Sequence, residues 1–149
     1  MKKNVKDTVN FNKEILFGEI GTLIGTQLFG HYASKIFTSP TKISVFVVLG
    51  SIICGSLFWF LMRVYDRKIR KKKSNKALAK EISYFVMAST SLAVCIYYPT
   101  LFYSTRHFLV HHDVVSYSAI VSQSIAFLLF LVGMNVYRHV LIKWKKITL

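Results

Sequence analysis

One carboxylate, Glu19, lies about one helical turn inside a long apolar segment, in the stretch FGEIGTLIGTQLFG of residues 17–30. A charged side chain at the centre of a bilayer costs about 3 kcal/mol on insertion scales, and less near the interface. Arg63 comes about one turn before the end of the next apolar segment, which would return to the same face. The sequence therefore predicts a Glu19–Arg63 ion pair. A substrate or proton site at Glu19 and a snorkelling, unpaired Glu19 are the alternatives.

A second group that could do chemistry is a histidine-rich segment. His107 and His111 are four residues apart and would share one face of a helical turn, and His112 and Asp113 follow directly. Imidazole and carboxylate groups of this kind bind zinc or copper. No second spaced cluster completes a ligand set, and histidines are ordinary in polar connections. No cofactor is therefore expected, and a zinc or copper site is the alternative.

No further combination of residues forms a recognisable catalytic set. The cysteines Cys54 and Cys95 are about forty residues apart in separate apolar runs, and Asp66 and Asp113 fall in different connections. A serine, a histidine and an acid at matching depth are not found either. Without a nucleophile, a base and an orienting group that could meet, an enzyme is the less favoured class.

The elements that must position these residues are long apolar runs. Of the 149 residues, 53% are hydrophobic and only 17% are charged, whereas about a quarter of a typical soluble domain is charged. A membrane-spanning helix needs about 20 mostly apolar residues. The sequence predicts an all-α integral membrane protein with one membrane domain (1–149) and four transmembrane helices, at residues 15–37, 43–65, 82–103 and 114–136.

Basic residues gather at the two chain ends and in the connection of residues 66–80, which contains RKIRKKK. The net charge is +14. Lys and Arg beside membrane spans are retained on the cytoplasmic side. We therefore expect a multi-pass protein of the plasma membrane with both termini and residues 66–80 inside. The basic loop is expected to contact anionic lipid headgroups, and nucleic acid is not expected as a partner.

Small residues in the first two spans predict close helix packing. Lipid is as apolar as leucine, so membrane helices associate through close contacts that small residues permit. Gly21 and Gly25 are four residues apart, which places both on one stripe of a helix. The residues predicted to form the contact between the first two spans are Gly18, Gly21, Gly25, Gly50 and Gly55.

The two halves of the chain resemble each other. KEI occurs at residues 13–15 and again at 80–82, and MRVY at residues 62–65 aligns with MNVY at 134–137. These matches favour two related helical hairpins of the same orientation, as in transporters with parallel repeats. Pro99 is expected to kink or end the third helix near its outer end.

In architecture only, the chain resembles the small four-span GtrA-type proteins, through its length, its number of spans and its glycine-containing first span. The resemblance implies a part in the movement of lipid-linked sugars. Small size, close-packing stripes and the lack of a catalytic set favour a non-catalytic subunit or accessory component of a membrane complex. Its partners would be other membrane subunits or further copies of itself.

Two other functions are open. The first is a small oligomeric transporter or flippase, which a polar cavity reaching Glu19 would favour. The second is an extracytoplasmic metal-binding membrane protein that uses the histidine-rich segment.

Overall fold

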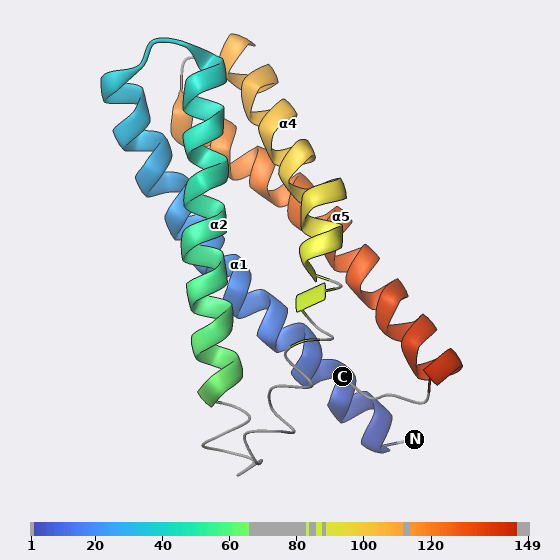
Figure 1. Cartoon of the computed structure of the whole chain (residues 1–149). Coiled ribbons are helices and arrows are strands. Elements are labelled where there is room, and N and C mark those ends of the chain that lie inside the picture. Colours follow the sequence, from blue (N-terminus) through green and yellow to red (C-terminus); the bar gives the residue numbers. More distant parts are fainter. Residues whose placement is uncertain (1, 66–82, 84–85, 88, 112–113, 146–149) are drawn as a thin grey trace.

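The computed structural model describes residues 2–65, 83, 86–87, 89–111 and 114–145, and the side chains of these residues except 2–11, 14 and 141–145. Its elements are α1 (Lys2–Ile36), α2 (Pro40–Val64), the π-helix η2 (Ala93–Tyr97), α4 (Tyr98–His111) and α5 (Val115–Lys145) (Figure 1). Within the described ranges there is no strand, which confirms the prediction of an all-helical fold.

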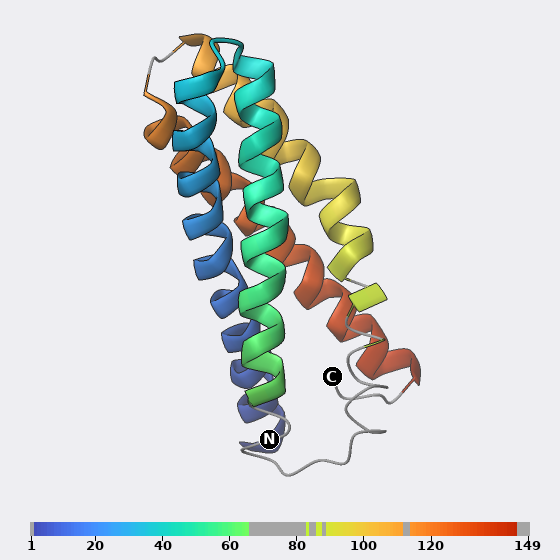
Figure 2. The same cartoon turned by 60° about the vertical axis from the view of Figure 1, so that its left-hand side comes forward.

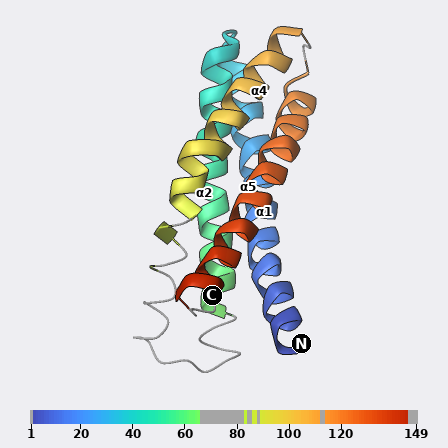
Figure 3. The ribbon, with the colours of Figure 1, turned by 90° about the vertical axis from the view of Figure 1, so that its right-hand side faces the viewer.

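The helices form a bundle of two hairpins that point the same way. α1 and α2 lie side by side, α4 packs against α2 and α5, and α5 also packs against α1 (Figure 2). The start of α1 and the end of α5 lie at one end of the bundle (Figure 3). The α1–α2 connection and the end of α4 lie at the opposite end. The duplication that would relate the two hairpins stays a prediction.

A proline sets the start of α2. Ser39 has extended backbone, with φ −77° and ψ 120°, because the ring of a following proline disfavours the helical region. Pro40 occupies the first turn, where its missing N–H would have had no helical partner. The Ile43 N–H donates to the Ser39 carbonyl at 3.1 Å. This tight connection makes α1 and α2 antiparallel neighbours.

The third helical segment comprises the described helical residues from 83 to 92 together with η2 and α4. It departs from the prediction around Pro99. Residues 104–113 were expected to form a connection, but α4 continues to His111. Pro99 lies in the first turn of α4 and does not end the helix, because the π-helix η2 comes just before it. The Tyr98 N–H donates to the Ala93 carbonyl, five residues earlier. This wider turn accommodates a proline ring that would otherwise crowd the preceding turn.

The helices also extend beyond the predicted spans at the chain ends. α1 begins at Lys2 and α5 ends at Lys145, whereas the apolar runs begin near residue 15 and end near residue 136. Hydropathy marks only the part of a helix that suits lipid. Neither polar end contains a proline or a glycine, so no strong helix breaker stops the helix there.

Two helices, α2 (Pro40–Val64) and the Val115–Val140 part of α5, are long and apolar enough to cross a membrane. Only 22% and 28% of their most apolar segments are buried inside the protein. A core helix of a soluble protein would be mostly buried, but here large apolar side chains such as Leu57 (53% exposed) and Val132 (64% exposed) face outward. Four spans and their sidedness stay predictions, and residues 66–80 lie outside the described residues.

The buried interior is rich in small and polar side chains. The fully or nearly buried apolar core residues where the helices meet are Ala33, Ile43, Val47, Tyr97, Leu101, Ala119 and Ala126. The buried uncharged polar residues are Thr26, Ser44, Ser51, Thr105, Ser118, Ser122 and Gln123. This composition is typical of helix contacts in membranes, where small and hydroxyl-bearing residues let backbones approach.

Candidate functional site

Glycines bring the α1 and α2 backbones into direct contact. A Cβ atom built on Gly25 or on Gly50 would overlap the backbone carbonyl group of the other. At Gly21, a Cβ atom would lie 2.6 Å from the Cys54 carbonyl oxygen and 2.6 Å from the Phe58 Cβ atom. Side-chain carbons do not approach other atoms this closely, so only glycine permits this separation of the helices.

The two remaining glycines of the predicted contact face larger side chains. A Cβ atom on Gly18 would lie 3.3 Å from the Trp59 Cβ atom, and one on Gly55 would overlap the Thr22 methyl group. The structure therefore places all five of these glycines at the contact between α1 and α2. This contact holds the face of α1 that carries Glu19 at a defined position against α2.

Glu19 and Thr22 lie three residues apart on α1 and share one face of that helix. The Thr22 hydroxyl oxygen lies 2.7 Å from the Glu19 backbone carbonyl oxygen and 3.0 Å from the Glu19 carboxylate Oε2. The hydroxyl carries one proton, which can be donated to either acceptor. Thr22 thus orients the carboxylate within α1.

Gln123 on α5 connects this carboxylate to the rest of the bundle. Its Nε2 atom donates to Glu19 Oε1 at 2.9 Å and also lies within hydrogen-bond distance of the Thr22 and Tyr97 hydroxyls. A side-chain amide has two N–H donors, so Gln123 serves two of its three acceptors at a time. The side chain is fully buried, which makes it the centre of the network.

Tyr97, the last residue of η2, completes the network. Its hydroxyl accepts a hydrogen bond from Ser51 on α2 at 3.5 Å. Its ring packs edge-to-face on Phe130 of α5, with centroids 5.7 Å apart at 72°. Four helical segments therefore contribute to one group of hydrogen-bonded side chains. We call this group the polar cluster, and its members are Glu19, Thr22, Ser51, Tyr97 and Gln123.

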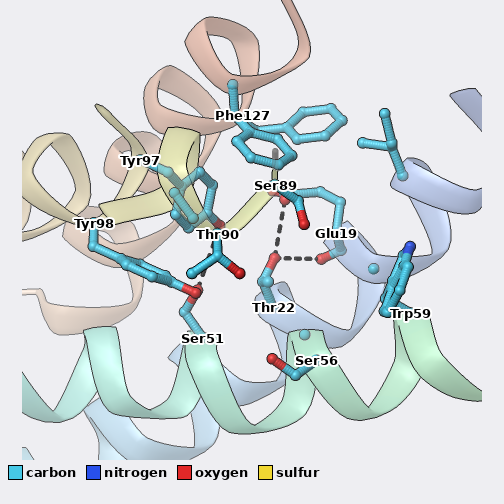
Figure 4. A pocket seen from close by; sticks show the side chains of 15 residues that line it. Glu19, Thr22, Ser51, Ser56, Trp59, Ser89, Thr90, Tyr97, Tyr98 and Phe127 are labelled. Atoms are coloured by element: carbon cyan, nitrogen blue, oxygen red, sulfur yellow. Dashed lines mark hydrogen bonds between the residues drawn. The ribbon is translucent and has the colours of Figure 1, made fainter. Parts of the chain in front are cut away.

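A cavity of about 150 Å³ lies beside the polar cluster (Figure 4). Four members of the cluster line it: Glu19, Thr22, Ser51 and Tyr97. The hydroxyl-bearing and aromatic residues in the rest of the wall are Ser56, Trp59, Ser89, Thr90, Tyr98, Phe127 and Phe130. The wall is completed by Ile15, Gly18, Gly55 and Ala93. Ser56 and Thr90 are also exposed, so the cavity opens at their level, between α2 and the third helical segment.

Arg63, the predicted partner of Glu19, is fully buried near the end of α2. The close contacts between α1 and α2 place Glu19 at the level of about residue 58 of α2. Arg63 lies about five residues further on, which is ~8 Å along the helix axis. The hydrogen bonds of the Glu19 carboxylate that the structure describes go to Thr22 and Gln123. The Glu19–Arg63 ion pair stays a prediction.

The histidine-rich segment is only partly described. His107 and His111 lie on one face of α4, with ring centroids 4.5 Å apart, and His111 Nδ1 is 2.8 Å from the His107 carbonyl oxygen. His112 and Asp113 lie outside the described residues. Among the residues that the structure describes, no three potential metal ligands come together. A zinc or copper site here stays a prediction.

If this segment binds zinc or copper, metal analysis of the purified protein will show a stoichiometric amount of the metal. His111→Ala will then lose the metal, because it removes one of the two ligands that α4 presents side by side. His31→Ala changes an exposed histidine of α1 and serves as the control that keeps the metal. Wild-type protein without bound metal would rule out this site.

Thr22, Ser51, Tyr97 and Gln123 were not assigned to a site from the sequence. The clearest signal was Gln123, an amide inside the apolar run of residues 114–136. Hydroxyl-bearing residues and tyrosines are common in membrane helices, so the other three carry little signal on their own. Their partners lie on other helices, which hydropathy and spacing do not pair.

The polar cluster offers one carboxylate, one amide and three hydroxyl groups beside the cavity, and these groups can hydrogen-bond a polar molecule. In comparisons with protein-family models, with curated proteins and with solved structures, the chain shows no match. The resemblance to the GtrA-type proteins thus remains one of architecture.

Proposed function

We propose that this protein is a small integral membrane carrier that binds a small polar solute in the cavity beside Glu19. The observation that carries the proposal is a cavity lined by a carboxylate and several hydroxyl groups, inside a bundle whose outer surface is apolar. An ionisable residue within a membrane helix that faces a cavity is the usual mark of a substrate or ion pathway. A carboxylate that served only to hold helices together would need no cavity.

The depth of Glu19 supports this proposal. Its level corresponds to about residue 58 of α2, and the bounds of α2 put the midpoint of that helix at residue 52. The separation of six residues corresponds to about 9 Å along the axis. The hydrocarbon core of a bilayer is about 30 Å thick. With α2 centred in the membrane, the cavity therefore lies within the hydrocarbon region, where lipid alone could not solvate a polar solute.

The construction of the bundle suggests how the cavity could change its access. The glycine contact makes α1 and α2 a rigid pair, because their backbones touch. The opposite wall comes from η2 and the residues before it, and π-helical turns occur frequently at functional sites. We propose that the third helical segment moves against the α1–α2 pair around η2, and that this movement opens the cavity to one face of the membrane or to the other.

Cysteine labelling tests this proposal. The native cysteines are first replaced by Cys54→Ala and Cys95→Ala, since both are free and alanine keeps the Cβ atom that packs near Gly25. Ser56→Cys then places a thiol in the cavity lining. Because thiols react with charged methanethiosulfonate reagents only in water, we expect this thiol in proteoliposomes to be modified from both faces of the membrane.

Leu57→Cys is the matched control, because it lies at the same depth on α2, is exposed and does not line the cavity. Lipid should protect it from the same reagents. A Ser56→Cys thiol that reacts no faster than the Leu57→Cys thiol would overturn the carrier proposal, and so would reaction from one face only. Such a result would favour the alternative of a non-catalytic subunit in a membrane complex.

A further inference from the structure

We infer that the cavity binds a small organic cation, with Glu19 as its counter-ion and the hydroxyl groups and aromatic rings of the wall as its other contacts. This inference rests on the proposed function and names the class of solute. The first argument is charge. Among the described residues that line the cavity, Glu19 is the only acid, and no Lys, Arg or His contributes to the wall. An anionic solute would meet no positive side chain in that wall, whereas a cation meets a carboxylate.

The second argument is the excess of hydrogen-bond acceptors. The Thr22 hydroxyl can donate its proton within α1, and the Ser89 hydroxyl donates to the Val86 carbonyl at 3.3 Å. Both then present lone pairs to the cavity. The Glu19 carboxylate has about four lone-pair positions. Thr22 and Gln123 donate to it, and the Tyr97 hydroxyl is a third hydrogen-bonding neighbour. A solute rich in N–H donors, such as an ammonium or guanidinium group, satisfies these acceptors.

The buried amide of Gln123 holds the acceptors of the wall in place. Its Nε2 atom donates to Glu19 and lies within hydrogen-bond distance of the Thr22 and Tyr97 hydroxyls. Gln123 itself does not line the cavity, so it acts on a solute through these three side chains.

The third argument is the aromatic wall. Besides Tyr97, four aromatic side chains line the same cavity as Glu19: Trp59, Tyr98, Phe127 and Phe130. Ring faces attract cations, and tryptophan attracts them most strongly. A carboxylate combined with aromatic rings selects positively charged organic groups over neutral molecules of equal size.

Size limits the solute. The cavity has a volume of about 150 Å³, which is enough for a ring of about six non-hydrogen atoms. Guanidinium and methylammonium fit within this limit. Each has a neutral counterpart of nearly equal shape, urea for guanidinium and methanol for methylammonium, which separates the effect of charge from the effect of size.

Calorimetric titration of the purified, detergent-solubilised full chain tests the inference. Guanidinium chloride, urea, methylammonium chloride and methanol are titrated at constant ionic strength in sodium chloride. We expect saturable binding of both cations and affinity for urea and methanol lower by about tenfold or more, because a carboxylate in a low-dielectric cavity discriminates strongly by charge. Sodium binding as tight as that of guanidinium would overturn the assignment to an organic cation.

Two substitutions of the same residue isolate the charge. Glu19→Asp keeps the carboxylate and should keep the preference for guanidinium over urea. Glu19→Gln keeps the hydrogen-bonding shape but removes the charge, and should lose that preference. If circular dichroism shows that Glu19→Gln is unfolded, Trp59→Leu is used in its place. We expect this variant to bind the cations about threefold more weakly and to bind urea with unchanged affinity.

The two proposals fail in different ways. Equal binding of guanidinium and urea, or binding of neither cation, would overturn the cation inference. In that case a water-accessible Ser56→Cys thiol would still support the carrier proposal. An inaccessible thiol combined with selective cation binding in detergent would overturn the carrier proposal and support the cation inference. In that case the cavity would be a cation-binding site without a transport path.

Discussion

Replacing Gly25 by alanine will destabilise the protein by about 3 kcal/mol, the upper end of the usual cost of overpacking. The new Cβ atom would overlap the Gly50 carbonyl group and lie 2.8 Å from the Cys54 Cβ atom. The overlapping atoms belong to the backbone, so no change of rotamer relieves the contact. α1 must move away from α2 along its length, and this movement also withdraws Glu19 from Gln123. Thermal unfolding of the detergent-solubilised protein, followed by circular dichroism, measures the effect.

Gly133→Ala is the matched control, because it makes the same substitution on α5. The atom that its Cβ would meet is Leu92 Cδ2, at 3.3 Å. This atom is the end of a flexible side chain, which can move by a few tenths of an ångström. Alanine also favours the helix over glycine by about 1 kcal/mol, so we expect Gly133→Ala to be neutral or stabilising. Equal stability of the two variants would show that the backbones of α1 and α2 do not touch at Gly25.

Replacing Gln123 by leucine will destabilise the protein by about 2 kcal/mol. A hydrogen bond between membrane helices contributes about 0.6 kcal/mol on average, which alone would give a small effect. However, Gln123 serves a carboxylate and two hydroxyl groups in the interior, and leaving a buried acceptor unpaired costs about 1–3 kcal/mol. The second contribution dominates because leucine offers these acceptors no donor. The same unfolding measurement applies.

Gln27→Leu is the control for this substitution. Gln27 also links α1 to α5, through a 3.3 Å hydrogen bond to the Ser116 carbonyl, but that bond is exposed. This bond serves a single backbone carbonyl, which keeps its helical hydrogen bond in α5, so we expect a loss of only about 0.6 kcal/mol, the average for one hydrogen bond between membrane helices. If Gln27→Leu and Gln123→Leu cost the same, Gln123 is not the centre of a buried network.

A double substitution tests whether Glu19 is the acceptor that matters. In Glu19→Leu combined with Gln123→Leu, both partners become apolar, a change that is often nearly neutral in a buried site. We therefore expect the double variant to be more stable than the sum of the single variants predicts, by about 1 kcal/mol. Additive effects would show that the two side chains do not interact.

Much of the fold follows from local pattern. Pro40 and the short connection before it set the start of α2, and the apolar runs mark the segments that form helices in lipid, where backbone groups must be paired within the segment. Glycines spaced by four residues mark a close contact, and chain adjacency makes α2 the natural partner of α1. Hydropathy does not predict the extension of α4 to His111, because the residues after Tyr103 are polar enough for a connection although they contain no proline or glycine that would stop a helix.

The polar cluster depends on long-range packing. Gln123 is 104 residues from Glu19 along the chain, and it reaches the carboxylate because α5 packs against α1. Tyr97 turns inward at the end of η2, where the π-helical turn before Pro99 changes the direction of the side chain. Spacing and hydropathy identify Glu19 as an unusual residue, since both depend on neighbours in the chain. They do not identify its environment, because the side chains around a buried carboxylate come from helices whose relative rotation is set by the packing of the whole bundle.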